Sequence, residues 1–271
     1  MQNNPLVSVV MPTFNEPKRI IESSISSILH QTYGNLELLI ADDSTNDETI
    51  KSIDKFAALD NRVVVIRETE RMGLVRAPNR ALKQAKGDYI ARMDGDDISV
   101  ANRLEIQLKY FNAHPEVSVL GGAMQVVDRD GNITALRKYP SEGKKLLGWM
   151  IARNPFGHPT VMFRSQLIRD GIMYDERMKK GCEDLELWLR LRNKGYKFHN
   201  MEDVLLQYRV CEDMTNKRKK DIRQNLKARV MNFSWRYGTY DLASLLFLLV
   251  RYCSPDIATS WFYRKENKQM F

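Results

Sequence analysis

Residues 89–97 read YIARMDGDD, and the rest of the chain is organised around this stretch. Its first half is apolar and follows Gly87, which predicts a short buried strand, and its second half holds three carboxylates within four residues. In an open α/β sheet, ligands bind beyond the carboxyl ends of the strands. Carboxylates crowded there repel one another unless a cation lies among them, and Asp oxygens suit Mg²⁺ or Mn²⁺. The stretch therefore predicts a divalent-cation site, with an acidic loop before the helix near Ala101 as the alternative.

Three strand–helix units precede this stretch. Short β-branched or apolar runs indicate strands, and amphipathic or capped runs indicate helices. The strands are predicted at 6–11, 36–41 and 63–66, and the helices at 18–31, 49–59 and 77–85. This βαβαβαβ order implies a parallel sheet with right-handed crossovers. A dinucleotide-binding turn is disfavoured, because residues 12–17 carry prolines where Gly-x-Gly-x-x-Gly would stand.

The chain after the acidic residues is expected to mix strands and helices. Helices are predicted at 103–111, at 142–153 and from Glu183 onward, and strands at 117–127, 133–139, 159–163, 196–199 and 204–209. Asp130-Gly131 is a hairpin turn signal between two of these strands. Glu183 and Asp184 begin a strongly periodic helix, where acids are favoured by the helix dipole.

Composition bounds the class of protein. The 271 residues allow one large domain, or one domain with an appendage. The three cysteines are odd in number and widely spaced, which suits a reducing cytoplasm and forms no metal motif. The first residues have no basic or long apolar segment, so no signal peptide is expected.

The net charge of +8 belongs to the end of the chain. Residues 217–271 carry 12 Lys or Arg and 4 Asp or Glu, whereas the other 216 residues carry 30 of each. The apolar run at 241–253 is shorter than the ~20 residues that span a bilayer. A basic segment beside an apolar one suits an interfacial helix on an anionic membrane, and the alternative is a helix packed on the catalytic body or on a second subunit. Nucleic-acid binding by this tail would leave the carboxylates unexplained, so nucleic acid is not an expected partner.

Five stretches, taken together and in order, resemble family-two glycosyltransferases with the GT-A fold. They are VVMPTFNE at 9–16, ADDSTND at 41–47, IARMDGDD at 90–97, HPTVMFR at 158–164 and EDLELWLR at 183–190. The resemblance covers residues 6 to about 210, and it is greatest to bacterial enzymes that build O-antigen, capsule or exopolysaccharide units. It implies an α/β GT-A catalytic domain at 1–216, with a nucleotide-sugar half at 1–97 and an acceptor half at 98–216, followed by a helical tail at 217–271.

The resemblance also implies roles for single residues. Asp43 would accept a hydrogen bond from a uracil ring, Asp96 would hold the metal on the diphosphate, and Asp184 would be the general base. The other residues implied at the nucleotide-sugar are Pro12, Thr13, Asn15, Glu16, Asp94 and Gly95. Gly95 replaces an Ala of many relatives, and no consequence of this difference is expected.

Four further residues are candidates by their type and place. Arg76 and Asn79 lie in the segment before the acidic stretch and are predicted to reach the nucleotide. His158 is predicted near the diphosphate as a metal ligand, with a general base or a packed structural histidine as alternatives. Arg92 is expected to pair with a nearby carboxylate.

The resemblance implies an inverting, metal-dependent transfer of a sugar from a UDP-sugar to a hydroxyl. The expected acceptor is a lipid-linked glycan, on undecaprenyl diphosphate, and the expected place is the inner face of the plasma membrane. The alternative is a metal-dependent nucleotidyltransferase acting on a sugar phosphate. Such an enzyme usually has a Gly-rich, basic loop after the first strand, and residues 12–17 do not form one.

Overall fold

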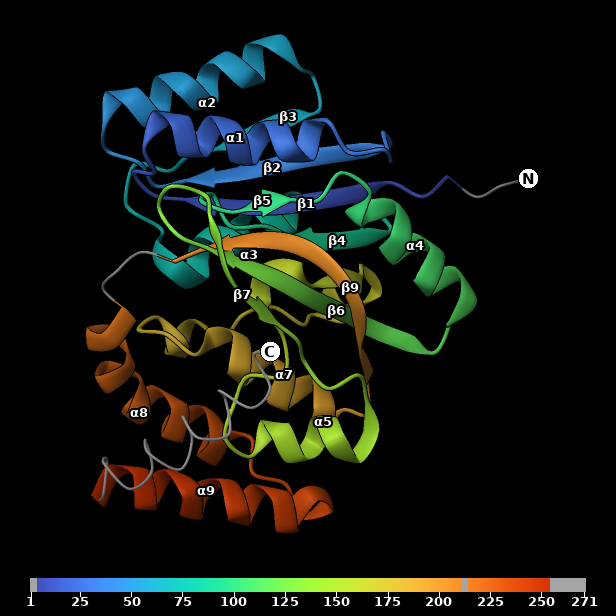
Figure 1. The fold of residues 1–271 in the computed structure, drawn as a ribbon, viewed down its shortest axis with the longest axis vertical. Coiled ribbons are helices and arrows are strands. Elements are labelled where there is room, and N and C mark those ends of the chain that lie inside the picture. The colour runs from blue at the N-terminus through green and yellow to red at the C-terminus, as the bar shows by residue number, and fades with distance from the viewer. Residues whose placement is uncertain (1–3, 211–213, 254–271) are drawn as a thin grey trace.

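A single mixed sheet with helices on both faces forms the body of the molecule (Figure 1). The computed structural model describes residues 4–210 and 214–253. The sheet order is β3-β2-β1-β4-β8-β6-β9-β5, with β7 paired to β6. The polar ends of the strands therefore come from both halves of the sequence but belong to one continuous sheet.

The first half is the predicted parallel unit. Its strands are β1 (Val7–Thr13), β2 (Leu36–Asp42), β3 (Val63–Ile66) and β4 (Tyr89–Arg92), and every pairing among them is parallel. Its helices are α1 (Lys18–Leu29), α2 (Asp47–Leu59) and α3 (Gly73–Gln84). The expected βαβαβαβ order is confirmed, and only α3 begins clearly earlier than predicted, with Pro78 inside it.

The second half begins with β5 (Ile98–Ser99), α4 (Arg103–Ala113), β6 (Val117–Val127), β7 (Ile133–Arg137), α5 (Gly143–Met150), η1 (His158–Thr160) and β8 (Met162–Arg164). It continues with α6 (Gln166–Arg169), η2 (Glu176–Met178), α7 (Glu183–Asn193) and β9 (Lys197–Arg209). The predicted strand at 159–163 is wrong in its first part, which is a 3₁₀ turn. The two strands predicted at 196–199 and 204–209 are one strand, whose pairing with β6 shifts register.

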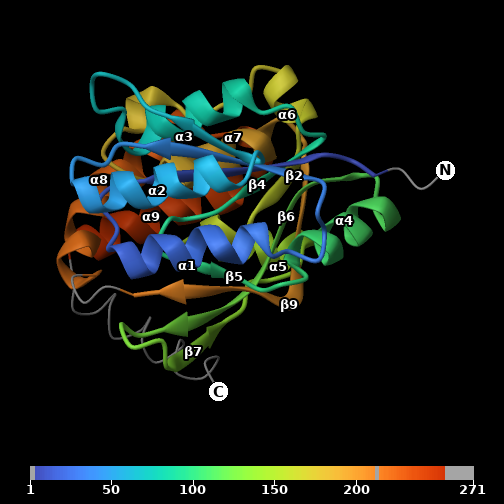
Figure 2. The same cartoon turned by 90° about the horizontal axis from the view of Figure 1, so that it is seen from above.

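Alternation along the central strands sends side chains to two separate cores. In β1, Val9 and Met11 join Ile21 of α1 on one face, whereas Val10 joins the opposite face, where Trp188 of α7 packs. Figure 2 shows α3, α6 and α7 on one side of the sheet and α1 and α4 on the other. Both faces of the parallel strands are thus buried, as expected for a sheet of this kind.

Two helices follow the sheet and dock on the second half. They are α8 (Met214–Met231) and α9 (Gly238–Cys253), separated by the short turn η3 (Trp235–Tyr237). Arg192 of α7 forms a buried ion pair with Asp241 of α9, at 2.7 Å between nitrogen and oxygen. Among the described residues, no helix is both long enough and apolar enough to cross a membrane.

Candidate active site

Three carboxylates meet where β4 ends and the chain turns toward β5. One oxygen from each of Asp94, Asp96 and Asp97 lies within 4.8 Å of the other two, and we call these residues the acidic cluster. Asp97 is fully buried, and its Oδ1 accepts the backbone N–H of Arg209 at 2.9 Å, whereas its Oδ2 has no partner among the described residues. Burial, together with the charge of Asp94, raises the pKa of Asp96 to about 6. Crowded, partly unpaired hard oxygens are what a divalent cation requires, so the cluster fits one.

Three arginines surround the acidic cluster. Arg92 pairs with Asp94 at 2.6 Å, which confirms the expected ion pair. Arg103 is fully buried behind the turn, donates to the carbonyl of Arg92 at 2.8 Å, and has its pKa lowered to about 9 by burial. Arg209 donates from Nε to the carbonyl of Asp96 at 3.2 Å. These contacts fix the backbone of the turn. The sequence pattern did not indicate either arginine, because no periodicity links Arg103 to Arg92, 11 positions earlier, or Arg209 to Asp96, 113 positions earlier.

The turn after β1 is tied to the turn after β2 by one side chain. Asn15 has a left-handed backbone with φ of 61°, and its Oδ1 accepts the N–H groups of Thr45 at 2.8 Å and Asn46 at 3.1 Å. The Glu16 carboxylate turns back and accepts the N–H of Phe14 at 2.9 Å. Burial raises the pKa of Glu16 to about 7. Asn15 therefore organises the loops at the predicted nucleotide site.

Gly95 lies against this β1 turn. A Cβ at Gly95 would lie 2.9 Å from Cγ2 of Thr13 and 3.2 Å from the carboxyl group of Glu16. The expectation that Gly95 has no consequence is therefore wrong, because a methyl group would displace Thr13 or Glu16. The missing side chain lets Glu16 lie close to the acidic cluster, where the charge of Asp96 adds to the rise in the pKa of Glu16.

Asp42, at the end of β2, is a buried structural carboxylate. Its Oδ1 accepts the hydroxyl of Thr13 at 3.0 Å and the N–H of Ser44 at 2.9 Å. Its Oδ2 accepts Nε of Arg67 at 2.7 Å. All of these partners hold the ends of neighbouring strands together, so Asp42 belongs to the scaffold of the site.

Asp43 caps the beginning of α3. Its two oxygens accept the N–H groups of Met72 at 2.9 Å and Gly73 at 2.5 Å. An ionised carboxylate offers about four acceptor positions, so lone pairs remain for a further donor. Pro12 lies nearby at the end of β1, in register with Ala41 of β2.

The two candidates in α3 have different surroundings. Asn79 is buried, and its amide donates to the carbonyl of Tyr174 at 2.9 Å and accepts the N–H of the same residue at 3.0 Å. Arg76 is 48% exposed and lies 3.7 Å from Glu68. The structure therefore uses the Asn79 side chain to hold the Tyr174 segment, while the Arg76 side chain remains largely in solvent.

An exposed stacking contact joins the turn after β1 to the loop before α3. The guanidinium of Arg71 lies 3.6 Å from the ring centre of Phe14, which follows β1. The sequence pattern indicates neither residue, because an exposed loop arginine and an exposed aromatic residue give no periodic signal. The pair places a cation beside the turn that follows β1.

The start of α7 brings a second acidic pair to the site. Gly181 and Cys182 both have positive φ, which turns the chain sharply before Glu183. Asp184 accepts its neighbour Leu185 N–H at 2.7 Å and the side-chain amide of Asn154. Glu183 is buried, and its carboxylate accepts a hydrogen bond from its own backbone N–H.

Arg92 pairs with Asp94 and also affects the pKa values of the Glu183–Asp184 pair. Burial raises the pKa of Glu183, and the charges of Asp184 and Asp94 raise it further while Arg92 lowers it. Burial also raises the pKa of Asp184, and Arg92 again opposes the rise. The helix start and the strand end, about 90 residues apart in the chain, therefore act on one another through this buried guanidinium.

His158 is a predicted metal ligand, but in the structure its side chain contacts Tyr174. Its Nε2 lies 2.7 Å from the hydroxyl of Tyr174, and its ring packs edge-on against Tyr174 and Trp188. Burial lowers the pKa of His158 well below its usual value, so the ring is neutral. The group of metal-ligating side chains found among the described residues consists of the acidic cluster and does not include His158.

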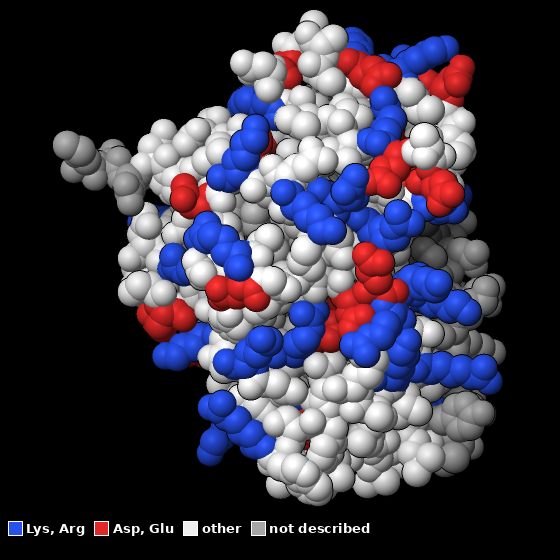
Figure 3. All heavy atoms as spheres, turned by 180° about the vertical axis from the view of Figure 1, so that it is seen from behind, with Lys and Arg blue, Asp and Glu red and all other residues white. Residues whose placement is uncertain are grey.

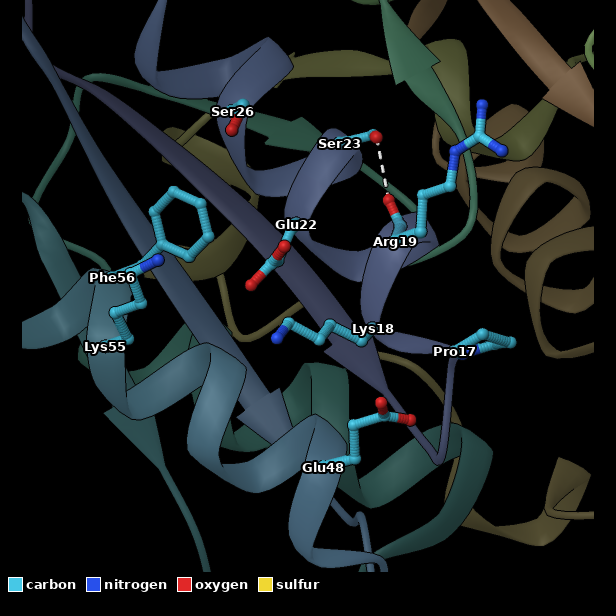
Figure 4. A pocket seen from close by; sticks show the side chains of 9 residues that line it. All are labelled: Pro17, Lys18, Arg19, Glu22, Ser23, Ser26, Glu48, Lys55 and Phe56. Atoms are coloured by element: carbon cyan, nitrogen blue, oxygen red, sulfur yellow. Dashed lines mark hydrogen bonds between the residues drawn. The ribbon is translucent and has the colours of Figure 1, made fainter.

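A separate hollow of about 660 Å³ lies between α1 and α2 (Figure 4). It is lined by Pro17, Lys18, Arg19, Glu22, Ser23, Ser26, Glu48, Lys55 and Phe56. None of these is a predicted site residue, and acidic and basic side chains are mixed in its wall. The hollow is therefore distinct from the carboxylate site.

Comparison with known proteins agrees with this geometry. The family model described as glycosyl transferase family 2 matches residues 8–170. EpsE of Bacillus subtilis (strain 168) is 37% identical over 215 residues, covering 79% of this chain and 75% of EpsE. The O-antigen biosynthesis glycosyltransferase WbnJ of Escherichia coli is 34% identical, covering 78% and 82% of the two chains. The amylovoran biosynthesis glycosyltransferase AmsE of Erwinia amylovora is 27% identical, covering 97% of this chain and 100% of AmsE.

Solved structures share the fold at low sequence identity. S. aureus TarS 1-349 in complex with UDP-GlcNAc superposes with a TM-score of 0.69 at 21% identity, covering 90% of this chain and 72% of that chain. Mannosyltransferase PcManGT from Pyrobaculum calidifontis, in complex with GDP-Man and Mn²⁺, gives a TM-score of 0.67 at 17% identity, covering 98% and 81%. These likenesses confirm the expected GT-A fold. The chain belongs to glycosyl transferase family 2.

Proposed function

We propose that this chain transfers a sugar from a UDP-sugar to an acceptor hydroxyl, with inversion at the anomeric carbon. One observation carries the proposal: the buried Arg92 guanidinium pairs with Asp94 of the acidic cluster at 2.6 Å and also lowers the pKa of Glu183 and of Asp184. The proposed metal site at the end of a strand and the proposed base would therefore lie close to one another. Transfer requires both groups within reach of the same sugar.

The uridine would bind between the ends of β1 and β2. Asp43 is oriented by the N–H groups of Met72 and Gly73, and its remaining lone pairs would accept the uracil N–H. Pro12 and Thr13 would line the pocket floor, and Asn15 would hold the loop in place. Arg76 would approach the phosphates, whereas Asn79 would act indirectly by fixing the Tyr174 segment.

Asp96 would hold a divalent cation, Mn²⁺ or Mg²⁺, with Asp94 and Asp97 beside it. The fit rests on three oxygens within 4.8 Å of one another and on the buried, unpaired Oδ2 of Asp97. When bound, the cation would neutralise the charge of the leaving diphosphate. Glu16, packed against Gly95, adds negative charge at this edge of the cluster.

Asp184 would act as the general base. The Asn154 amide donates to one of its oxygens and fixes the carboxylate, which leaves acceptor positions for a hydroxyl proton. As the acceptor oxygen bonds to the anomeric carbon, Asp184 takes its proton, and the bond to the UDP oxygen breaks on the opposite face. One displacement of this kind converts an α-linked donor into a β-linked product. His158 would orient Tyr174 beside Arg92 without contacting the cation.

The acceptor is proposed to be a lipid-linked glycan in bacterial surface polysaccharide synthesis. AmsE and WbnJ are named for amylovoran and O-antigen biosynthesis, and AmsE matches along its whole length. Such acceptors are embedded in a membrane, so the enzyme would work at the inner face of the plasma membrane. The basic tail supports this placement by its net charge.

The test is a donor screen on the full chain with Mn²⁺ and with Mg²⁺. We expect hydrolysis or transfer with at least one UDP-sugar, release of UDP, and no activity in excess EDTA. GDP-mannose is the essential comparison, because the PcManGT structure contains that donor. Activity with GDP-mannose alone would refute the uridine pocket. Release of pyrophosphate from UTP and a sugar phosphate would favour the nucleotidyltransferase instead.

A further inference from the structure

The helix α9 carries apolar side chains on its outer face as well as on its inner face. The inner face is held by the buried Leu248 and by polar contacts: Asp241 accepts both terminal nitrogens of Arg192 at 2.7 and 2.8 Å, and Ser244 accepts Nη1 of Arg229 at 2.6 Å. A helix on the surface of a globular protein normally turns its apolar side inward and its polar side to water. In α9, by contrast, the buried charged residue faces the protein and the exposed face is apolar.

The outer face of α9 is apolar. Its side chains are 45–61% exposed, and their spacing of i, i+4, i+7 and i+8 places them on one stripe. These residues are Leu242, Leu246, Leu249 and Val250. Such a stripe in water has no stabilising partner among the residues that the structure describes.

Neighbouring segments extend this apolar surface. Trp235, in the turn before α9, is 82% exposed, and Leu226 and Val230 lie on the exposed side of α8. Seven of the thirteen exposed large hydrophobic residues in the described chain lie between residues 226 and 250. We call these seven the C-terminal apolar surface: Leu226, Val230, Trp235, Leu242, Leu246, Leu249 and Val250.

Basic residues border the C-terminal apolar surface. Arg223 and Lys227 are exposed and alternate with Leu226 and Val230 on one side of α8. Figure 3 shows the end of the molecule where α9 lies as largely uncharged, with Lys and Arg gathered along its border. The segment 217–271 carries a net charge of +8, since its 12 basic residues exceed its 4 acidic ones.

The positive charge distinguishes two candidate partners for this surface, a second copy of the chain and an anionic bilayer. Two copies of the surface brought face to face would juxtapose two basic borders, which repel one another. An anionic bilayer attracts Lys and Arg, receives leucine side chains below its headgroups, and places Trp at the boundary. We infer that the C-terminal apolar surface docks on an anionic phospholipid bilayer, with α9 lying in the plane of the interface.

This docking would orient the proposed active site. In Figure 1, α9 lies at the opposite end of the molecule from α1 and α2, and α7 lies between. The α7 start, with Asp184, would therefore be nearer the membrane than the nucleotide-binding strands are. The inference rests on the proposed function only in this respect: a lipid-linked acceptor would reach Asp184 from the bilayer while the donor enters from water.

The test compares vesicle binding by three full-length proteins. They are the parent chain, the variant Leu242→Ser/Leu246→Ser/Leu249→Ser, and the matched control Leu59→Ser, which replaces a 74% exposed leucine at the end of α2. Because all four leucines are exposed, folding should survive in each protein. Mn²⁺-supported UDP binding, measured in parallel, reports on the proposed donor site independently of the membrane.

We expect the parent and Leu59→Ser to sediment with phosphatidylglycerol-containing vesicles, and less with pure phosphatidylcholine vesicles or in high salt. The triple variant should bind at least about ten-fold more weakly, with unchanged UDP affinity. Equal vesicle binding by the triple variant and the parent would overturn the inference. So would a parent chain that is a dimer in solution and that the triple variant converts to a monomer. Loss of UDP binding by all three proteins would count against the proposed function and leave the membrane result interpretable.

Discussion

The chain has two pairs of consecutive acidic residues, Asp42–Asp43 and Glu183–Asp184, and the two pairs differ in what surrounds them. Each of the four oxygens of the first pair accepts at least one hydrogen bond from the protein, and the donors come from Thr13, Ser44, Arg67, Met72 and Gly73. In the second pair, the hydrogen bonds come from the helix start itself and from one side chain: Asp184 accepts its own N–H, the N–H of Leu185 and the amide of Asn154, and Glu183 accepts its own N–H. Burial raises the pKa of both members of the second pair.

This difference distinguishes carboxylates that hold the fold together from carboxylates that take part in the reaction. A carboxylate whose oxygens are all occupied holds loops together, and it binds a ligand only through the lone pairs that remain. A carboxylate whose pKa is raised by burial is costly to ionise and is therefore ready to take a proton. The first pair should accordingly matter for stability and nucleotide choice, and the second pair for the rate of transfer.

The largest expected effect is on the transfer rate of Asp184→Asn. The substitution keeps the shape and one of the two acceptor oxygens but removes the proton acceptor, so the rate should fall about 10²–10⁴-fold. UDP affinity and the free energy of unfolding should change little. Glu183→Gln is the matched control in the same pair and should be milder. A greater loss in Glu183→Gln than in Asp184→Asn would move the base to Glu183.

The next effect is on stability and concerns Asp42→Ala. This change leaves Thr13, Ser44 and Arg67 without their acceptor, and we expect the free energy of unfolding to fall by about 2–3 kcal/mol. Chemical denaturation of Asp42→Ala and Asp184→Asn measures the contrast directly. Equal stability of the two variants would remove the distinction drawn between the pairs.

A smaller effect is expected for Gly95→Ala. The new methyl group would lie 2.9 Å from Thr13, and the resulting shift should lower the free energy of unfolding by about 1 kcal/mol and weaken Mn²⁺-supported UDP binding. Gly34→Ala is the control, because a Cβ there meets no atom within 4 Å. Thermal denaturation measures the change in stability, and calorimetry measures the change in UDP binding. Identical behaviour of both variants would show that the turn adapts freely.

The smallest effect concerns pH. Burial raises the pKa of Glu16 to about 7 and that of Asp96 to about 6, from ordinary values of 4.5 and 3.8. The folded, metal-free protein therefore binds more protons than the unfolded chain between these values, so its stability should fall as pH rises from about 5 to about 7. Mn²⁺ binds ionised carboxylates and should raise the melting temperature more at pH 7.5 than at pH 5.5. A Mn²⁺ shift that is larger at the lower pH would contradict the cluster assignment.

The sequence predicted the parallel half of the sheet and the position of the acidic cluster, because both depend on local patterns. Alternating apolar runs end at Asp42 and Asp94, and parallel strands bring such ends to one edge. It did not predict that β8 would insert antiparallel between β4 and β6, since a three-residue strand has almost no pattern.

The sequence also did not predict contacts between residues that are far apart in the chain. The N–H of Arg209 meets Asp97 across 112 positions, and Asn79 meets Tyr174 across 95. No periodicity or spacing encodes such pairs. The sequence therefore suggested a nucleotide role for Asn79, whereas in the structure its side chain forms two hydrogen bonds with the backbone of Tyr174. The tail was only partly predictable: its charge and apolar run were visible, but the face by which α9 docks depends on contacts with Arg192 and Arg229.

The stereochemistry of the product shows whether Asp184 deprotonates the acceptor in a single displacement at a carbon held by the nucleotide site. Transfer from an α-linked UDP-sugar, followed by proton NMR of the new anomeric centre at early times, should show only the β-linkage. An α-linked product would require two displacements or a different mechanism, and would contradict the role assigned to Asp184.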